Sequence, residues 1–212
     1  MSPGAYDRAS AFKTKQQQMK TDIILAGVGG QGILSIAAVL GTAAIDNNYH
    51  LKQAETHGMS QRGGAVVSHL RISDQPIASD LIPQGKADLI LSVEPMEALR
   101  YVLFLKEDGY IVTNVTPFIN IPNYPAIQTI LDEINHYPHN ISIDADAIAR
   151  ETGSGKASNM VMLGAASPFI GVSVKKIQSG IKALFEKKGD DIVKLNMEAF
   201  QKGREYTLAQ QQ

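Results

Sequence analysis

Two glycine-rich segments hold the residue types and spacing from which chemistry could arise. The first follows an apolar run and precedes a long helical pattern, and it reads Gly27-Val28-Gly29-Gly30-Gln31-Gly32. Glycines at this spacing permit a tight turn and bring backbone N–H groups and a helix N-terminus close to a phosphate, pyrophosphate or carboxylate. They also suit a plain turn from a strand into a buried helix. The sequence therefore favours an anion-binding loop and leaves the turn-only reading open.

The second segment concentrates polar side chains and glycines within ten residues, Glu55-Thr56-His57-Gly58-Met59-Ser60-Gln61-Arg62-Gly63-Gly64. An arginine can hold a phosphate or carboxylate through two parallel hydrogen bonds, and neighbouring glycines expose further backbone donors. Plain connections rarely need this composition, so we interpret the segment as a site loop. The alternative is a polar surface turn in which Arg62 makes an ordinary salt bridge.

A dinucleotide site would need one more residue, an acid at the end of the second strand that binds a ribose hydroxyl. Glu55 comes late for this role, and Asp46 falls at the end of a helix. The mismatch weakens a stand-alone NAD- or flavin-dependent dehydrogenase, which nevertheless stays an alternative.

The remaining polar motifs give weaker signals. Pro138 separates His136 from His139, and no third ligand accompanies them, so we expect no metal site. The stretch around Ser154 and Lys156 lacks the spacing of a phosphate-binding P-loop, which favours a flexible turn. Asn159 is interpreted as a helix cap or as a polar group facing a partner. With no acid–base pair and no activated nucleophile in view, the chain is expected to bind, or to complete a site whose chemistry lies elsewhere.

Apolar runs and helical patterns predict the elements that hold these loops. Strands are expected at residues 23–26, 51–54, 65–72, 89–93, 110–115 and 141–143. Helical patterns cover residues 33–45, follow Pro95 with Leu99 and Leu103 in one apolar stripe, follow the cap Asp144, and continue at 158–166, 177–185 and 192–199.

The alternation of strands and helices predicts an α/β fold, a three-layer Rossmann-like sandwich around a mostly parallel sheet, with residues 60–72 as an optional antiparallel edge. In the first helix Leu34, Ala38 and Ile45 make the outer side apolar too, so burial is expected on both sides. We expect one domain over residues 19–212, and a polar tail or appended remnant over residues 1–18.

Composition excludes several classes of function. The 212 residues include 20 basic and 21 acidic side chains, a formal net charge of −1, so a broad grip on nucleic acid or anionic lipid is not expected. No apolar stretch is long enough for a membrane span, and the cytoplasm is the expected location. Because there are no cysteines, thiolates of this chain cannot hold an iron–sulfur cluster or zinc. Any redox centre must belong to a dissociable cofactor or another chain.

Together the two glycine-rich segments resemble the gamma-type domain of the 2-oxoacid:ferredoxin oxidoreductases. Their amino-acid sequences are most similar to those of the beta subunits in the branch of this family that oxidises indolepyruvate. The likeness runs from about Met19 to the last helices, and it includes Leu81-Ile82-Pro83, Ala87-Asp88-Leu89-Ile90, Glu94-Pro95 and the stretch from Asn159 to Ala165.

The resemblance implies a subunit of a hetero-oligomer that decarboxylates an aryl 2-oxoacid oxidatively, transfers the acyl group to coenzyme A and passes electrons to ferredoxin. In this family thiamine diphosphate and the iron–sulfur clusters belong to a large alpha subunit, so this chain alone would hold no cofactor and would be inactive. The residues expected at the coenzyme A site are Gly27, Gly29, Gly30, Gln31, Gly32, Ser60, Gln61, Arg62, Gly63 and Gly64, with the amides of residues 29–31 facing an anion. A contact near the partner's thiamine site, or a purely assembling module, are the other readings.

Overall fold

The structure is a computed structural model that describes residues 19–58 and 63–211. A six-stranded sheet in the order β2-β3-β1-β4-β5-β6 lies at its centre. The strands are β1 (Lys20–Val28), β2 (His50–His57), β3 (Ala65–Ser73), β4 (Ala87–Ser92), β5 (Leu105–Asn114) and β6 (Asn140–Ile143). The α-helices of this part of the chain are α1 (Ile33–Ile45), α2 (Pro95–Arg100), α3 (Ile127–Asn135), α4 (Ala145–Glu151), α5 (Ser158–Ala166), α6 (Val174–Phe185) and α7 (Asp190–Gln210).

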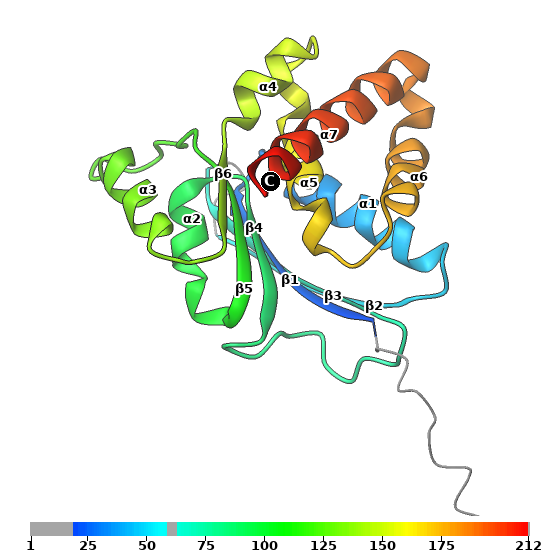
Figure 1. The fold of residues 1–212 in the computed structure, drawn as a ribbon, viewed down its shortest axis with the longest axis horizontal. Coiled ribbons are helices and arrows are strands. Elements are labelled where there is room, and N and C mark those ends of the chain that lie inside the picture. Colours follow the sequence, from blue (N-terminus) through cyan, green and yellow to red (C-terminus); the bar gives the residue numbers. More distant parts are fainter. Residues whose placement is uncertain (1–18, 59–62, 212) are drawn as a thin grey trace, which may run out of the picture.

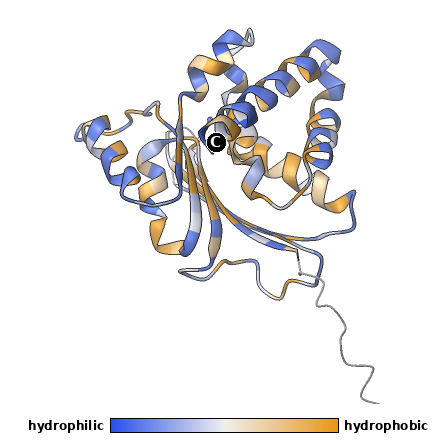
Figure 2. Cartoon of the chain, in the orientation of Figure 1, coloured by the Kyte–Doolittle hydropathy of each residue, from blue (hydrophilic) through white to orange (hydrophobic). Residues whose placement is uncertain are grey.

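Helices cover both faces of the sheet, as Figure 1 shows, so the predicted three-layer α/β sandwich is confirmed. Helices α1 and α4–α7 share one hydrophobic core with the sheet. Helices α2 and α3 pack on the opposite face around Ala98, Ile111 and Ile130. Figure 2 shows hydrophobic residues concentrated along the strands and in the helices against them.

Strand β1 is buried on both faces, which explains its uninterrupted apolar sequence. Ile23 and Leu25 belong to the core beneath α1 and α5, whereas Ile24 and Ala26 belong to the opposite core. All four side chains are at most 1% exposed. A strand covered by helices on both sides cannot alternate apolar with polar residues, so β1 reads as one continuous apolar run.

The topology places β3 inside the sheet and not at its edge, which corrects the expectation for residues 60–72. Strand β3 pairs antiparallel with both β1 and β2, while the pairs β1–β4, β4–β5 and β5–β6 are parallel. The edge falls to β2, whose Lys52 and Gln53 side chains are exposed. Charged and polar side chains suit an edge strand, because they discourage pairing with another chain.

Three other expectations differ from the structure. The outer side of α1 is not buried, since Leu34 is 50% and Ile45 63% exposed. Helix α2 ends at Arg100, and a 3-10 turn (Val102–Phe104) follows, so Leu103 does not continue its apolar stripe and is 69% exposed. Helix α3 was not expected at all.

Helices α5 and α7 approach so closely that their backbones touch. A methyl group built on Gly164 would lie 1.9 Å from the carbonyl oxygen of Phe200, and one on Gly203 would lie 2.0 Å from that of Val161. Both distances are far shorter than any van der Waals contact, so only glycine fits at either position. Every residue of α5 from Asn159 to Ala166 is buried as a result.

We predict that Gly203→Ala lowers the free energy of unfolding by about 3 kcal/mol, because the methyl group overpacks a helix contact made by backbone atoms. Alanine favours a helix by about 1 kcal/mol over glycine, so the observed loss is the net of the two effects. Urea titration followed by circular dichroism measures it. Gly155→Ala is the control, since its nearest neighbour would lie 3.8 Å away. Equal stability of the two variants would contradict the packing argument.

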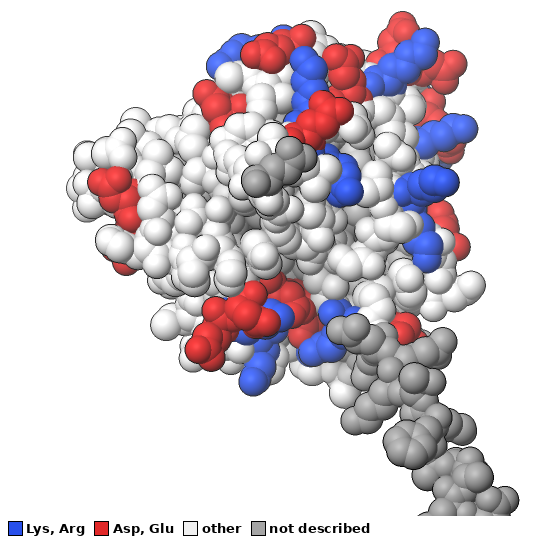
Figure 3. Space-filling view, viewed as in Figure 1, with Lys and Arg blue, Asp and Glu red and all other residues white. Residues whose placement is uncertain are grey.

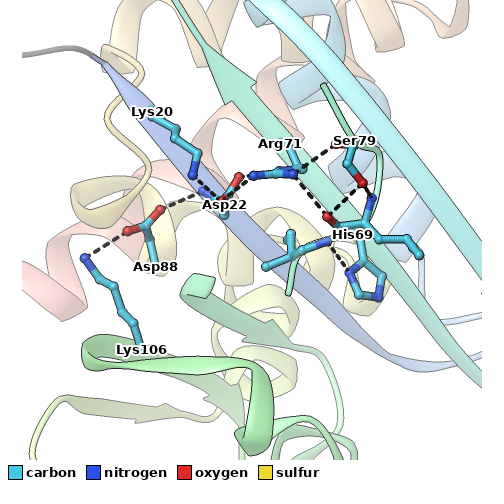
Figure 4. Close-up of polar contacts among 9 residues, drawn as sticks. Lys20, Asp22, His69, Arg71, Ser79, Asp88 and Lys106 are labelled. Carbon is cyan, nitrogen blue, oxygen red and sulfur yellow. Dashed lines mark hydrogen bonds and ion pairs between the residues drawn. The ribbon is translucent and has the colours of Figure 1, made fainter. Parts of the chain in front are cut away.

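A line of polar contacts crosses four neighbouring strands (Figure 4). The Arg71 guanidinium donates from Nε and Nη2 to the two carboxylate oxygens of Asp22, at 2.8 and 3.0 Å. The backbone N–H of Asp22 donates to Asp88, whose other carboxylate oxygen lies 2.8 Å from Lys106 Nζ. The remaining donor of Arg71, Nη1, binds the carbonyl oxygens of Ser79 and Leu81, both at 3.0 Å. The buried ion pair thus holds segment 79–82 against the sheet.

His69 fixes the same segment through a proton-sensitive bond. Its Nδ1 accepts a hydrogen bond from the backbone N–H of Ile82 at 3.2 Å, which requires that nitrogen to be unprotonated. Burial, and secondarily the charge of Arg71, lower the pKa of His69 below its ordinary value of 6.5. The folded protein therefore favours neutral imidazole.

We predict that stability falls as the pH drops through and below about 6.5, because the unfolded state then binds a proton that folded His69 resists. Above that pH the contribution of His69 is fully present. Urea midpoints measured between pH 7.5 and 5 test this. His69→Asn should reduce the dependence of the urea midpoint on pH. His136→Asn is the control, because His136 is exposed. A profile unchanged by His69→Asn would show that this histidine does not set it.

Candidate functional site

The predicted glycine turn, residues 27–32, lies where β1 ends and α1 begins, and we call it the glycine loop. Gly30 has φ of +103° and Gly32 has φ of +83°, a backbone region that favours glycine. Gly32 is also the N-cap of α1 and provides no side-chain cap. A methyl group at Gly27 would lie 2.4 Å from a side-chain carbon of Val93, so the loop also sits tightly against the chain after β4.

The two glycine-rich segments meet through their backbones. The N–H of Gly29 donates to the carbonyl oxygen of Gly64 at 2.9 Å, and that of Gly63 donates to Gly29 at 3.4 Å. Glu55 and His57 lie on β2, with the His57 ring in contact with the Glu55 carboxylate. Ser60, Gln61 and Arg62 lie outside the described residues, so their predicted roles stay predictions.

Two of the three backbone amides that were expected to face an anion already donate hydrogen bonds within the protein. Gly29 N–H binds Gly64, and Gln31 N–H binds the carbonyl oxygen of Val28 at 3.1 Å. Among the described residues, the amides of Gly30, Gly32, Ile33 and Leu34 have no hydrogen-bond partner. The first N–H groups of a helix point outward without an intrahelical acceptor, so an anion would be held here and not at residues 29 and 31.

Two side chains brace the loop from within. The Gln31 amide accepts from the Val28 N–H at 2.8 Å and donates to the carbonyl oxygen of Val93 at 3.4 Å. Asn159, the second residue of α5, donates to the carbonyl oxygen of Gly32 at 3.1 Å. A methyl group at Gly32 would collide with that Asn159 amide at 2.4 Å. Asn159 is therefore not a helix cap; it ties the start of α5 to the start of α1, and its contact with a partner stays a prediction.

Glu94, the N-cap of α2 two residues after β4, organises the loop on the other side of the site. Its buried carboxylate accepts hydrogen bonds from the N–H of Glu97 at 2.9 Å, from the N–H of Phe118 at 3.3 Å and from the hydroxyl of Tyr124. Burial, together with the bond to Glu94, raises the pKa of Tyr124 above its ordinary value. The carboxylate thus caps α2 and anchors the proline-rich segment around residues 117–125.

The anchored segment brings apolar side chains to the edge of the glycine loop. Asn120 donates to the carbonyl oxygen of Gly63 at 2.6 Å, and Phe118 lies next to the same glycine. Four large side chains in this neighbourhood are exposed, and we call them the apolar rim: Leu34 (50%), Phe118 (41%), Ile119 (72%) and Ile121 (38%). Exposed apolar groups gathered around a polar loop are typical of a surface that another molecule covers.

Two hollows border the glycine loop. A smaller one of about 280 Å³ contains Gly29, Gly30, Leu34, His57 and Val66, and we call it the glycine pocket. A larger one of about 690 Å³ lies toward α5 and α7 and shares Gly30 and Gly32 with the first. The glycine loop therefore forms a wall common to both hollows.

Other candidates from the sequence do not join this site. Strand β3 separates Glu55 on β2 from the glycine turn after β1, so the acid is not placed as a ribose ligand beside that turn. His136 contacts Glu133 at an exposed position, and no group of three His, Cys, Asp or Glu side chains in the described residues could hold a metal ion. Within the same residues, no helix combines the length and apolar character needed to cross a membrane.

Sequence reasoning missed Glu94 as an anchor and Lys156 as a lining residue of the larger hollow. An acid directly before Pro95, at the end of an apolar strand, is a helix-cap signal that could have identified Glu94. Lys156 belongs to a short 3-10 turn (Gly155–Ala157) after α4, and only the tertiary structure brings it near the glycine loop.

Comparison with known proteins gives a consistent result. The family described as pyruvate ferredoxin/flavodoxin oxidoreductase matches residues 22–206. An indolepyruvate oxidoreductase subunit of Pyrococcus horikoshii is 36% identical over 86% of this chain and 93% of its own length. The corresponding subunit of Methanothermobacter thermautotrophicus is 32% identical over 87% of this chain and 96% of its own.

Solved structures share the fold. A gamma subunit of a keto/oxoacid ferredoxin oxidoreductase from Geobacter sulfurreducens superposes with a TM-score of 0.66 and 26% identity, over 89% of this chain and 99% of that one. A 2-oxoglutarate:ferredoxin oxidoreductase from Magnetococcus marinus gives a TM-score of 0.73 at 23% identity, and the match spans 90% of this chain but only 31% of that chain. The chain belongs to the pyruvate ferredoxin/flavodoxin oxidoreductase family and is a subunit of a 2-oxoacid:ferredoxin oxidoreductase.

Proposed function

We propose that this chain is the non-cluster subunit of an indolepyruvate-type oxidoreductase, in which a larger subunit carries thiamine diphosphate and the iron–sulfur clusters. The complex would decarboxylate an aryl 2-oxoacid, deliver the acyl group to coenzyme A and pass electrons to ferredoxin. The relatives at 32–36% identity carry names that specify indolepyruvate, which supports this substrate class.

One observation carries the proposal: the glycine loop offers amides that have no partner among the described residues, and exposed apolar side chains, Leu34 and Phe118, lie beside it. The amides of Gly30, Gly32 and Ile33 suit a phosphate group, which coenzyme A has and a 2-oxoacid lacks. Leu34 and Ile119 would be desolvated by a partner that closes over the same face. A binding site rimmed by an interface fits a subunit that completes another subunit's active site.

The chemistry of the side chains supports the division of labour. The chain has no cysteine, so it cannot ligate an iron–sulfur cluster through thiolates. Thiamine diphosphate on the partner would stabilise the carbanion left by decarboxylation, and this chain would bind and orient coenzyme A. A contact of the glycine loop near the partner's thiamine site is the second arrangement that we consider.

The partner and the rim can be tested together. We predict that the affinity-tagged chain, expressed in its native cells, recovers a stoichiometric large subunit with iron, sulfide and thiamine diphosphate. That complex should reduce a viologen dye when it receives indolepyruvate and coenzyme A, and the chain alone should not. If the chain is recovered alone and binds NAD(H) saturably, the result would support the alternative of a stand-alone dehydrogenase and contradict the proposed function.

The matched variants are Ile119→Glu in the rim and Leu103→Glu outside it. Both residues are about 70% exposed, at 72% and 69%. Leu103 precedes β5, at the amino ends of the parallel strands, whereas the glycine loop lies at their carboxyl ends. Ile119→Glu should lose at least about tenfold in recovered large subunit, since a buried unpaired charge is costly. Equal recovery with both variants would exclude the rim as the interface.

Arg62→Ala tests the contribution of the second segment to coenzyme A binding. In the assembled complex we predict that KM for coenzyme A rises about tenfold, as expected for one lost charge-assisted hydrogen bond. Lys52→Ala, on the distal part of the same β2–β3 hairpin, is the control. Steady-state kinetics at saturating indolepyruvate give KM for coenzyme A in both variants. An unchanged KM in Arg62→Ala would refute the assignment of Arg62 to the coenzyme A site.

A further inference from the structure

One exposed segment of the chain has a composition that is unusual for a surface loop. Residues 117–125, which we call the proline segment, lie between β5 and α3 and belong to neither a helix nor a strand. All of them except Pro117 and Tyr124 are exposed. The sequence nevertheless has no charged side chain from Gly109 to Leu131. Depletion of charge is typical of the core of a protein–protein interface.

The surface around the proline segment also carries little charge. In Figure 3, charged side chains crowd over α4, α6 and α7, whereas the side that carries α2 and α3 shows few of them. Within the segment, Phe118, Ile119 and Ile121 are 41%, 72% and 38% exposed. A partner with an apolar surface would bury these side chains and would not have to remove water from a charge.

Three prolines stiffen the segment. Pro117, Pro122 and Pro125 each have a restricted φ, which reduces the number of conformations that the backbone can adopt. A segment that is ordered before a partner binds loses less conformational entropy on binding. The rest of the protein must then hold the segment in the correct place.

The buried carboxylate of Glu94 holds it there. The carboxylate accepts hydrogen bonds from the N–H of Phe118 at 3.3 Å and from the hydroxyl of Tyr124, near the two ends of the segment. Glu94 is 0% exposed, and among the described residues no ion pair neutralises it, since Arg100 pairs with Glu97. A buried carboxylate without a cation depends on hydrogen-bond donors, and two of its three donors belong to the proline segment.

We propose that Glu94 is a positioning residue for assembly, which holds the proline segment in the arrangement that the larger subunit binds. This inference rests on the proposed function, which supplies that partner. Because Glu94 is buried, it acts through Phe118 and Tyr124 and not by touching the partner. Loss of a bond to Glu94 lets the segment adopt other arrangements. The apparent affinity for the larger subunit then falls with the fraction of chains that stay competent to bind.

Tyr124→Phe removes one donor to Glu94 and keeps the aromatic ring. The complex with this variant should dissociate at about tenfold higher concentration, as expected for one lost hydrogen bond to a charged group. Dilution of the co-purified complex, followed by viologen reduction with indolepyruvate and coenzyme A, gives the concentration at which half of the specific activity is lost. The kcat of the undiluted complex should not change.

Tyr137→Phe is the matched control for this measurement. Tyr137 packs in the same hydrophobic cluster as Tyr124, and its hydroxyl makes no hydrogen bond to Glu94. Its complex should dissociate at the wild-type concentration. Equal dilution curves for Tyr124→Phe and Tyr137→Phe overturn the proposal.

Glu94→Asp separates the positioning of the segment from the capping of α2. Aspartate is a favoured N-cap, so α2 should stay capped. Its side chain is one methylene group shorter, so we expect it not to reach the proline segment. The dilution curve should therefore shift as it does in Tyr124→Phe. An unshifted curve would show that Glu94 only caps the helix, and the proposal would be wrong.

Hydrogen exchange of the full chain distinguishes this inference from the proposed function. The amides of residues 118–124 should exchange about tenfold faster in Tyr124→Phe than in Tyr137→Phe, and equal exchange overturns the proposal. If no larger subunit accompanies the wild-type chain, the proposed function fails, and exchange still decides whether Glu94 holds the segment. If exchange accelerates but the dilution curve does not shift, the larger subunit does not bind the segment, and the proposal is overturned.

Discussion

Helix α5 packs against α7 at a distance that only glycine allows, and the geometry of the site depends on this contact. Gly164 and Gly203 let each helix reach the backbone of the other, and α5 is buried from Asn159 to Ala166 between the sheet and α7. A helix held on all sides cannot rotate or slide without breaking this packing. Its second residue, Asn159, is therefore fixed, and through Asn159 so is the carbonyl of Gly32. The start of α1, the glycine loop and the wall between the two hollows all follow from that position.

The same logic explains how much of the fold could be predicted from the sequence. Strand β1 and helix α5 were predicted because each has a continuous apolar run with clear ends, and the cap Asp144 was predicted because its side chain satisfies the N–H of Ala147 locally. Helix α3 was missed because the prolines before it and the polar residues within it resemble a loop. The insertion of β3 between β1 and β2 could not be predicted, since strand order depends on pairing between distant segments and not on local pattern.

The candidate site, too, could be predicted from the sequence only where its signal is local. The glycine loop could be located from spacing alone, because positive φ values and close approach leave a local signature in Gly30 and Gly32. Which amides of the described loop already have a hydrogen-bond partner could not be inferred, since the pairing of Gly29 with Gly64 joins segments that are distant in the sequence. Composition also failed to distinguish buried from exposed positions on α1. Leu34 and Ile45 look like core residues in sequence but are 50% and 63% exposed, because apolar character alone does not show whether the same chain covers a side chain.

The apolar rim also bears on how a cell can make this protein. Leu34, Phe118, Ile119 and Ile121 expose large apolar groups to water. A copy released from the ribosome without the other subunits of its complex would keep these groups in water, where they can associate with other exposed chains or be bound by chaperones. Synthesis of all subunits in matched amounts, close together in time, would shorten that exposure. Balanced expression would in this sense follow from the surface chemistry of this chain.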